Sequence, residues 1–128
     1  MIVLDTSAVV ACLTDETEAS AFAERIALAG QRIISSFNLL ESRLVLVFSK
    51  GIPAQMIDDF LANERIAVVP FDEALSHLAF DAYGRYGKGR HAARLNMGDC
   101  AAYALAKSRG WPLLYKGDDF ALTDIERA

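Results

Sequence analysis

Acidic residues follow or flank several short apolar segments, where they could hold a metal ion. The candidates are Asp5, Glu41, Asp99 and the adjacent pair Asp118 and Asp119. Carboxylates held close together raise one another's pKa unless a cation compensates for their charge. Oxygen ligands without a Cys or His pair favour Mg²⁺ or Mn²⁺. Ions of this kind activate water for attack on a phosphodiester, so the pattern indicates hydrolysis of nucleic acid.

Each acidic residue also has a purely structural explanation. Asp5 and Asp99 are suited to capping the N-terminus of a helix, because their carboxylates accept hydrogen bonds from free backbone N–H groups. The segment from Asn38 to Glu41 fits a capping box. Asp118 and Asp119 follow Gly117 and have the chemistry of an ordinary turn. Convergence of all these carboxylates on one pocket would favour the metal site.

Three polar residues lie next to the acidic candidates. Thr6 and Ser7 follow Asp5, and Asn38 precedes Glu41 by three positions. Their side chains could hydrogen-bond a ligating carboxylate, a bound water or a phosphate. Each could equally cap a helix.

The segment from Arg85 to Arg94 is basic and rich in glycine. Its candidate nucleic-acid-binding residues are Lys88, Arg90, His91 and Arg94, and no acidic residue occurs between Asp81 and Asp99. A cationic loop leading into Asp99 could hold phosphates, with Tyr86 or His91 stacking on a base. The alternative is a solvated loop, and His91 is a weaker candidate for a metal ligand or general base.

Short apolar runs and periodic helices alternate along the chain. Strands are expected at residues 1–4, 32–35, 66–69 and 113–115, with helices from Thr6, at 17–29, from Ser36 or Asn38 to 51, at 53–63, 72–86 and 98–108. The tail, 118–128, could hold one helical turn and an edge strand. Strands this short and apolar predict a parallel sheet buried on both faces. Chemistry then belongs at the carboxyl ends of the strands.

Composition sets the remaining bounds. The 128 residues carry 13 basic and 17 acidic side chains, a net charge of −4, and 53% of them are hydrophobic. We expect one domain, residues 1–128, that is cytoplasmic, since no window approaches the roughly 18 apolar residues of a membrane span and no secretory signal is evident. We expect Cys12 and Cys100 to be reduced thiols packed in the core. Trp111 is expected to anchor the packing of its turn. Lys116 could neutralise the acidic pocket, touch phosphate or be merely solvated.

Five segments together resemble a PIN domain of the VapC toxin type, in that family's order. They are IVLDTSA at 2–8, NLLE at 38–41, GKGRH at 87–91, LNMGDC at 95–100 and LLYKGDDF at 113–120. The resemblance spans nearly the whole chain. It implies a three-layer α/β/α fold with a short parallel sheet of four to five strands.

The resemblance also implies an activity and partners. It implies a Mg²⁺-dependent endoribonuclease, with Mn²⁺ as a possible substitute, that is the toxin of a toxin–antitoxin pair and usually a homodimer. The partner would be a VapB-type antitoxin that covers the acidic pocket and alone contacts operator DNA. Asp5, Glu41 and Asp99 match the family's principal acidic positions, and either Asp118 or Asp119 completes the set. Thr6 or Ser7 matches its polar position.

On this basis Asp5 and Asp99 are expected to bind metal directly or through water. Glu41 would position the attacking water or act as a base, leaving a 5′-phosphate and a 3′-hydroxyl. The first alternative is a catalytically idle PIN-like scaffold that binds RNA or a partner. A phosphoacceptor receiver domain fits poorly, because Thr6 and Ser7 stand where a second acidic residue is needed. An aspartyl-nucleophile hydrolase lacks its second acid at Ser7.

Overall fold

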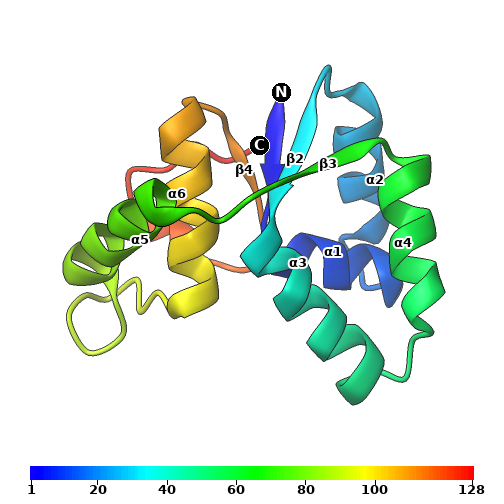
Figure 1. The fold of residues 1–128 in the computed structure, drawn as a ribbon, viewed down its shortest axis with the longest axis horizontal. Helices are drawn as coiled ribbons and strands as arrows, with labels where there is room; N and C mark the ends of the chain where they lie inside the picture. Colours follow the sequence, from blue (N-terminus) through cyan, green and yellow to red (C-terminus); the bar gives the residue numbers. More distant parts are fainter.

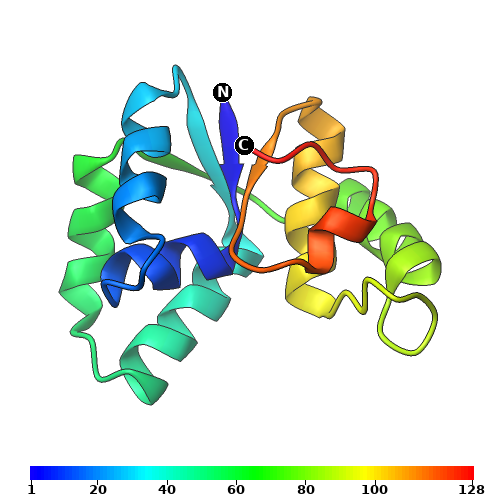
Figure 2. The same cartoon turned by 180° about the vertical axis from the view of Figure 1, so that it is seen from behind.

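A parallel β-sheet forms the middle layer of the protein (Figures 1 and 2). The computed structural model describes residues 1–128 in full. Its strands are β1 (Ile2–Leu4), β2 (Arg32–Ser35), β3 (Ile66–Val69) and β4 (Leu113–Leu114). They are ordered β3-β2-β1-β4, and every neighbouring pair is parallel. The expected four-stranded parallel sheet is therefore confirmed.

Helices cover both faces of this sheet. They are α1 (Thr6–Leu13), α2 (Ala19–Leu28), α3 (Ser36–Arg43), α4 (Ala54–Asn63), α5 (Glu73–Tyr86) and α6 (Met97–Arg109). In Figure 1, α1, α2 and α4 lie on one side of the sheet, and α5 and α6 lie on the other. The α3 helix continues directly from β2. This is the three-layer arrangement expected from the sequence.

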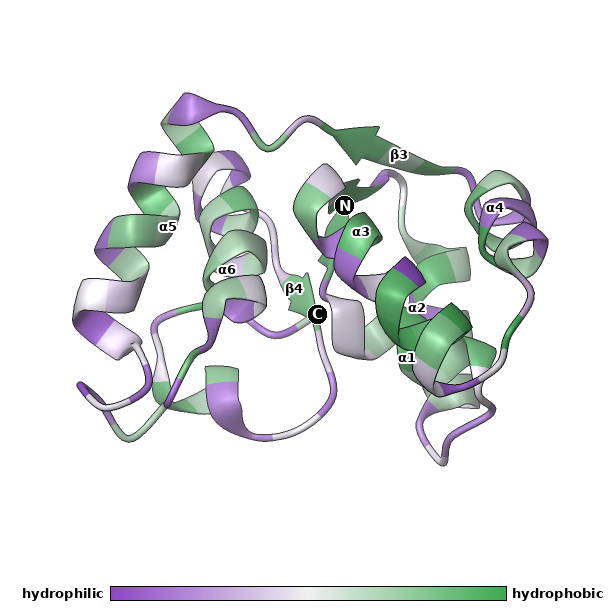
Figure 3. Cartoon of the chain, turned by 60° about the horizontal axis from the view of Figure 1, so that its bottom comes forward, coloured by the Kyte–Doolittle hydropathy of each residue, from purple (hydrophilic) through white to green (hydrophobic).

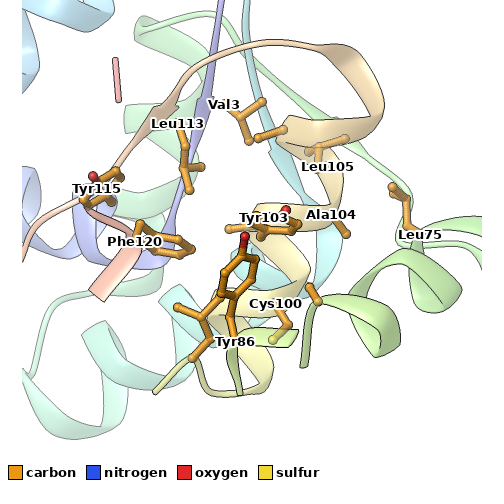
Figure 4. Packing of buried hydrophobic residues seen from close by; sticks show 14 of the residues in the cluster. Val3, Leu75, Tyr86, Cys100, Tyr103, Ala104, Leu105, Leu113, Tyr115 and Phe120 are labelled. Atoms are coloured by element: carbon orange, nitrogen blue, oxygen red, sulfur yellow. The ribbon is translucent and has the colours of Figure 1, made fainter. Parts of the chain in front are cut away.

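Alternating side chains of the central strands feed two separate hydrophobic clusters. Val3 and Ile33 pack into the cluster with α5, α6 and β4, part of which is drawn in Figure 4. Ile2, Leu4 and Ile34 point to the opposite cluster, with α1, α2 and α4. Successive side chains of a strand point to opposite faces, so both faces of β1 and β2 are buried. This burial holds the carboxyl ends of the two strands in place.

Aromatic side chains join the α5–α6 layer to the C-terminal segment. The ring centroids of Tyr86 and Tyr103 are 5.7 Å apart, and those of Tyr115 and Phe120 are 4.9 Å apart (Figure 4). The Tyr103 hydroxyl donates a 2.5 Å hydrogen bond to Asp124. These contacts hold the short 3₁₀-helix η2 (Asp119–Leu122) against the domain.

The expectation that every strand is covered on both faces is wrong for β3. This strand is at the edge of the sheet, and Val68 is 43% exposed although Ile66 is buried. Its sequence is apolar throughout, as Figure 3 shows by colour. An apolar composition therefore does not reveal which strand is at the edge.

Several helix boundaries differ from the sequence expectation. Residues Leu44–Ser49 form a π-helical segment, η1, after α3, and α4 begins one residue after Pro53. The α6 helix begins at Met97, earlier than expected. The tail makes one bridge, between Leu113 and Arg127, in place of an edge strand.

Both cysteines and Trp111 are part of the hydrophobic core or pack against it. Cys100 is buried, Cys12 is half-buried, and both are free thiols. Trp111 packs against the cluster that contains Val3, as an anchor would. No helix in the structure is both long and apolar enough to cross a bilayer.

Candidate active site

Asp5 lies where β1 passes into α1, and only one of its carboxylate oxygens has a partner. As the N-cap of α1, its Oδ2 accepts hydrogen bonds from the Ser7 amide at 3.0 Å and the Ser7 hydroxyl at 2.6 Å. Its Oδ1 is buried and accepts no hydrogen bond. Burial is the main cause that raises the pKa of Asp5 to about 7, and the charges of Asp99 and Glu41 add to it.

Asp99 lies in the first turn of α6. Its Oδ2 accepts from the Asn96 amide at 3.0 Å, while Asn96 Oδ1 accepts from the Asp99 amide at 2.8 Å. This is a capping box in which Asn96 is the N-cap, so Asp99 is not the cap that its position suggested. Burial is the main cause that raises the pKa of Asp99 to about 6, and the charges of Asp119 and Glu41 also raise it.

Glu41 faces the other two carboxylates from α3. The Thr6 hydroxyl donates a short hydrogen bond to Glu41 Oε1. The expected capping box with Asn38 is wrong, because the N-cap of α3 is Ser35, whose hydroxyl accepts from the Asn38 amide at 3.0 Å. Glu41 is therefore free to take part in the site.

Asn38 connects three helices beneath the carboxylates. Its side chain is completely buried. The amide Nδ2 donates to Thr6 Oγ1 at 3.2 Å and to the Gly98 carbonyl at 2.9 Å, and Oδ1 accepts from the Ser35 hydroxyl at 2.7 Å. Asn38 thus acts as a brace between α1, α3 and α6 and does not point a free group at a ligand.

One pocket of about 410 Å³ brings five of the sequence candidates together, Asp5, Thr6, Ser7, Glu41 and Asp99, whereas Asn38, Asp118 and Asp119 do not line it. Its polar lining includes Asp5, Thr6, Ser7, Glu41, Asn96 and Asp99. Two further lining residues are Glu16, which the sequence analysis missed, and Lys116, which it left undecided. Glu16 lies in a turn after α1, where nothing in the sequence pattern marks it. Asn96 was also missed, although an Asn three residues before an Asp is a detectable capping signal.

Asp118 and Asp119 differ in their effect on Asp99. Asp119 is close enough for its charge to raise the pKa of Asp99. Asp118 precedes η2, makes no capping hydrogen bond and is not among the charges that raise the pKa of Asp99, although neither Asp118 nor Asp119 is part of the pocket lining. The geometry therefore favours Asp119 as the neighbour of the other carboxylates.

The donor set suits a hard divalent cation. No three acidic, His or Cys side chains are arranged to hold an ion by themselves. Mg²⁺ is usually held by one or two carboxylates and keeps several waters, so three protein ligands are not required. The unpartnered Oδ1 of Asp5, in a pocket shared with Asp99, fits this mode of binding.

The basic loop lies outside the acidic pocket. It is closed by hydrogen bonds from the Lys88 amide to the Leu95 carbonyl at 3.0 Å and from the Leu95 amide to the Tyr86 carbonyl at 2.9 Å. Four exposed residues, Lys88, Arg90, His91 and Arg94, line a shallow depression on it. His91 does not line the acidic pocket, which argues against a role as a metal ligand there.

Tyr86 cannot serve as the stacking platform considered above. It is buried, and its ring meets the His91 ring edge-on with centroids 5.1 Å apart. His91 Nδ1 accepts a 3.0 Å hydrogen bond from the Ala93 amide. The exposed His91 ring is thus held in place, while Tyr86 belongs to the core.

An apolar cavity of about 520 Å³ adjoins both regions. Phe37, Phe80 and Met97 contribute to its walls. Lys88 of the basic loop lines this cavity, as does Asn96, which also lines the acidic pocket. The cavity therefore shares one lining residue with the loop depression and one with the acidic pocket.

Comparison with known proteins agrees with this fold. The family model described as "PIN domain" matches residues 2–126. A "Ribonuclease VapC" of Mycolicibacterium smegmatis is 45% identical over 124 residues, which are 96% of each chain. "Ribonuclease VapC28" of Mycobacterium tuberculosis is 40% identical over 128 residues, covering 98% of this chain and 96% of that protein.

Solved structures share the same fold at much lower identity. The crystal structure of Mycobacterium tuberculosis VapC20, described as a sarcin-ricin loop cleaving toxin, covers 100% of this chain and 98% of its own, with a TM-score of 0.77 and 16% identity. A toxin–antitoxin complex from Klebsiella pneumoniae covers 97% and 93%, with a TM-score of 0.72 and 17% identity. The chain therefore belongs to the PIN-domain family and, within it, to the VapC proteins.

Proposed function

We propose that this protein is a metal-dependent endoribonuclease and the toxin of a toxin–antitoxin pair. The observation that carries the proposal is the buried, unpartnered Oδ1 of Asp5 in a pocket shared with Glu41 and Asp99. An unpaired carboxylate oxygen is costly to bury unless a cation compensates for it. The names of the VapC relatives, which are ribonucleases, support the same conclusion.

Asp5 and Asp99 would hold Mg²⁺ or Mn²⁺, which when bound supplies a Lewis acid for the attacking water and for the phosphodiester. Glu41, oriented by the Thr6 hydroxyl, would accept the proton of that water. Ser7 holds Asp5 Oδ2, so that Oδ1 is left for the ion. Asp119 would add the fourth negative charge.

The basic loop would bind the RNA backbone on the approach to the carboxylates. Lys88, Arg90 and Arg94 are exposed, and none of them forms an ion pair. Cationic side chains that are not already paired can each neutralise a phosphate and release its counterions. His91 supplies an exposed ring beside them.

The purified protein, free of any partner, tests the activity. We expect it to cut RNA with Mg²⁺ or Mn²⁺ and to lose activity in chelator. Asp5→Ala and Asp99→Ala should abolish cleavage, whereas Asp59→Asn, an exposed carboxylate on α4, should have no effect. Cleavage that survives both alanine substitutions would refute the assignment. Absence of any cleavage would favour the idle PIN-like scaffold.

A VapB-type antitoxin is the partner we propose, with operator DNA contacted only through it. The exposed apolar side chains Leu40, Leu44 and Phe48 lie on α3 and η1 beside Glu41. Exposed apolar surface next to a catalytic pocket suits a protein that covers both. Homodimers are part of the same proposal. Light scattering of the protein alone, and then with its antitoxin, measures both assemblies.

A further inference from the structure

A single lysine stands among the carboxylates of the acidic pocket. The pocket is lined by the carboxylates of Asp5, Glu16, Glu41 and Asp99, and Lys116 is the one basic side chain in its lining. The basic loop lines a different depression. An RNA phosphate that enters the pocket therefore meets only one protein cation there.

Two hydrogen bonds connect the backbone of Lys116 to the candidate metal ligand. The Lys116 amide donates to Ser7 Oγ at 2.9 Å, and the Ser7 hydroxyl donates to Asp5 Oδ2 at 2.6 Å. Lys116 follows β4, which pairs with β1 directly before Asp5. The position of Lys116 relative to Asp5 is thus determined by the core of the sheet.

The side chain of Lys116 is also held. Its ammonium forms a short ion pair with Glu16 Oε2 and lies 3.7 Å from Glu18 Oε1. Glu16 is itself oriented, because the Thr14 hydroxyl donates to Glu16 Oε1 at 3.2 Å. The Lys116 side chain is 40% exposed, so its remaining N–H groups are open to a ligand.

We propose that Lys116 binds a backbone phosphate of the RNA beside the scissile bond, and that Glu16 is a positioning residue that holds the Lys116 ammonium at the mouth of the pocket. This inference rests on the proposed ribonuclease function and assigns it a further substrate-binding residue. An ammonium has three N–H donors, so Lys116 can keep Glu16 while it binds phosphate. Charge-assisted hydrogen bonds of this kind are among the strong ones.

The test is steady-state cleavage of a randomised pool of single-stranded RNA oligonucleotides, labelled with a fluorophore and a quencher. Lys116→Gln should raise KM about tenfold, as expected for loss of a charge-assisted hydrogen bond, with kcat within about twofold of wild type. Lys116→Arg, which keeps the charge, should restore KM to within about threefold. Lys107→Gln is the matched control, because Lys107 is a half-exposed, ion-paired lysine outside the pocket.

Salt dependence separates phosphate binding from a merely structural ion pair. Each phosphate contact to a single strand contributes about 0.7 to the slope of log affinity against log salt. Lys116→Gln should lower this slope by about that amount, and Lys107→Gln should leave it unchanged. Fluorescence anisotropy with the same RNA pool in chelator gives the slope without cleavage, so the inference is decided even if no cutting occurs.

Glu16 is tested through a double-mutant cycle. Glu16→Gln should raise KM by up to about fivefold, because the ammonium is no longer held. The Glu16→Gln/Lys116→Gln variant should be no worse than Lys116→Gln alone, since Glu16 acts through Lys116. Thermal unfolding of each variant verifies that it is folded.

Two results would overturn the inference. One is a Lys116→Gln variant whose KM and salt slope match those of wild type, which would leave the ribonuclease assignment standing. The other is additive effects of the two substitutions on KM, which would remove Glu16 as a positioning residue. Failure of the ribonuclease assignment is recognised separately. In that case the wild type does not cut RNA, although its salt slope for RNA binding still exceeds that of Lys116→Gln by the expected amount.

Discussion

A methyl group at Gly98 would lie 2.3 Å from both carboxylate oxygens of Glu41. Gly98 is in the first turn of α6, and its carbonyl accepts a hydrogen bond from the side-chain Nδ2 of Asn38. The absence of a side chain at Gly98 therefore allows Glu41 to approach the N-terminus of α6, and with it Asp99. The glycine in the first turn of α6 is therefore required for the position of the Glu41 carboxylate in the pocket.

Gly98→Ala should abolish most RNA cleavage and leave the fold intact. The atoms that must move are the end of a flexible side chain, so the cost falls on the position of Glu41 and not on the backbone. Misplacement of a catalytic group by about 1 Å can cost about a hundredfold in rate. Cleavage kinetics and thermal unfolding measure the two effects separately.

Two other glycines provide the controls for Gly98→Ala. A methyl group at Gly84 meets no atom within 4 Å, so Gly84→Ala should change neither activity nor stability greatly. At Gly87 the added carbon would lie 2.4 Å from the Tyr83 carbonyl oxygen, so Gly87→Ala should destabilise the fold. Full activity of Gly98→Ala would show that Glu41 has no part in cleavage.

The stability of the metal-free protein should fall as the pH rises from about 4 to about 7. Burial raises the pKa of Asp5 from 3.8 to about 7. Between these values the folded protein keeps a proton that the unfolded chain has released, so the free energy of unfolding decreases with pH. At 1.36 kcal/mol per pKa unit, the contribution of Asp5 to this decrease is about 4 kcal/mol.

Asp5→Asn isolates this effect. The amide retains an oxygen to accept from Ser7 but carries no charge, so the variant should be more stable than wild type at about pH 8 and similar at about pH 4. Thermal unfolding in chelator measures the difference. Added Mn²⁺ should stabilise the wild type at about pH 8, because it binds the charged carboxylate, and should not stabilise the variant. Equal responses of the two proteins would contradict Asp5 as a ligand.

Asp119 and Asp118 should respond differently to neutralisation. The charge of Asp119 raises the pKa of Asp99, whereas Asp118 is not among the charges that raise it. Asp119→Asn should lower the rate of RNA cleavage about tenfold, which corresponds to about 1.4 kcal/mol on the activation barrier, because a negative charge next to Asp99 is lost. Asp118→Asn should remain within about twofold of wild type. The reverse order of the two variants would assign the fourth carboxylate to Asp118.

Arg32 is a structural clamp remote from the pocket. Its guanidinium donates to the carbonyls of Ile26 at 2.5 Å, Ala27 at 3.1 Å, Ala29 at 2.9 Å and Glu64 at 3.0 Å. Arg32→Met should cost about 2–3 kcal/mol, because part-buried carbonyls lose charged donors. Arg25→Met, an exposed arginine on α2, should stay within about 0.5 kcal/mol. Urea unfolding measures both, and equal losses would contradict the clamp.

Much of the fold was predictable from local patterns. Short apolar runs identified β1 to β4, with Pro70 bounding β3, and the alternation with helices predicted a parallel sheet. The edge position of β3 was not predictable, because IAVV is as apolar as a central strand. The π-helical turn at Leu44–Ser49 was also missed, since its residues keep an ordinary helical pattern.

The types and order of the acidic residues, and the position of Asp5 directly after a strand, follow from the amino-acid sequence alone, because strand ends and helix starts are local features. Which of these residues meet depends on the packing of the whole domain. This packing placed Glu41 against Gly98, brought the charge of Asp119 close to Asp99, and paired Glu16 with Lys116 at the pocket mouth. Such contacts depend on how helices pack over a shared sheet. Glu16 and Lys116 are 100 positions apart, so no local sequence pattern predicts that they meet.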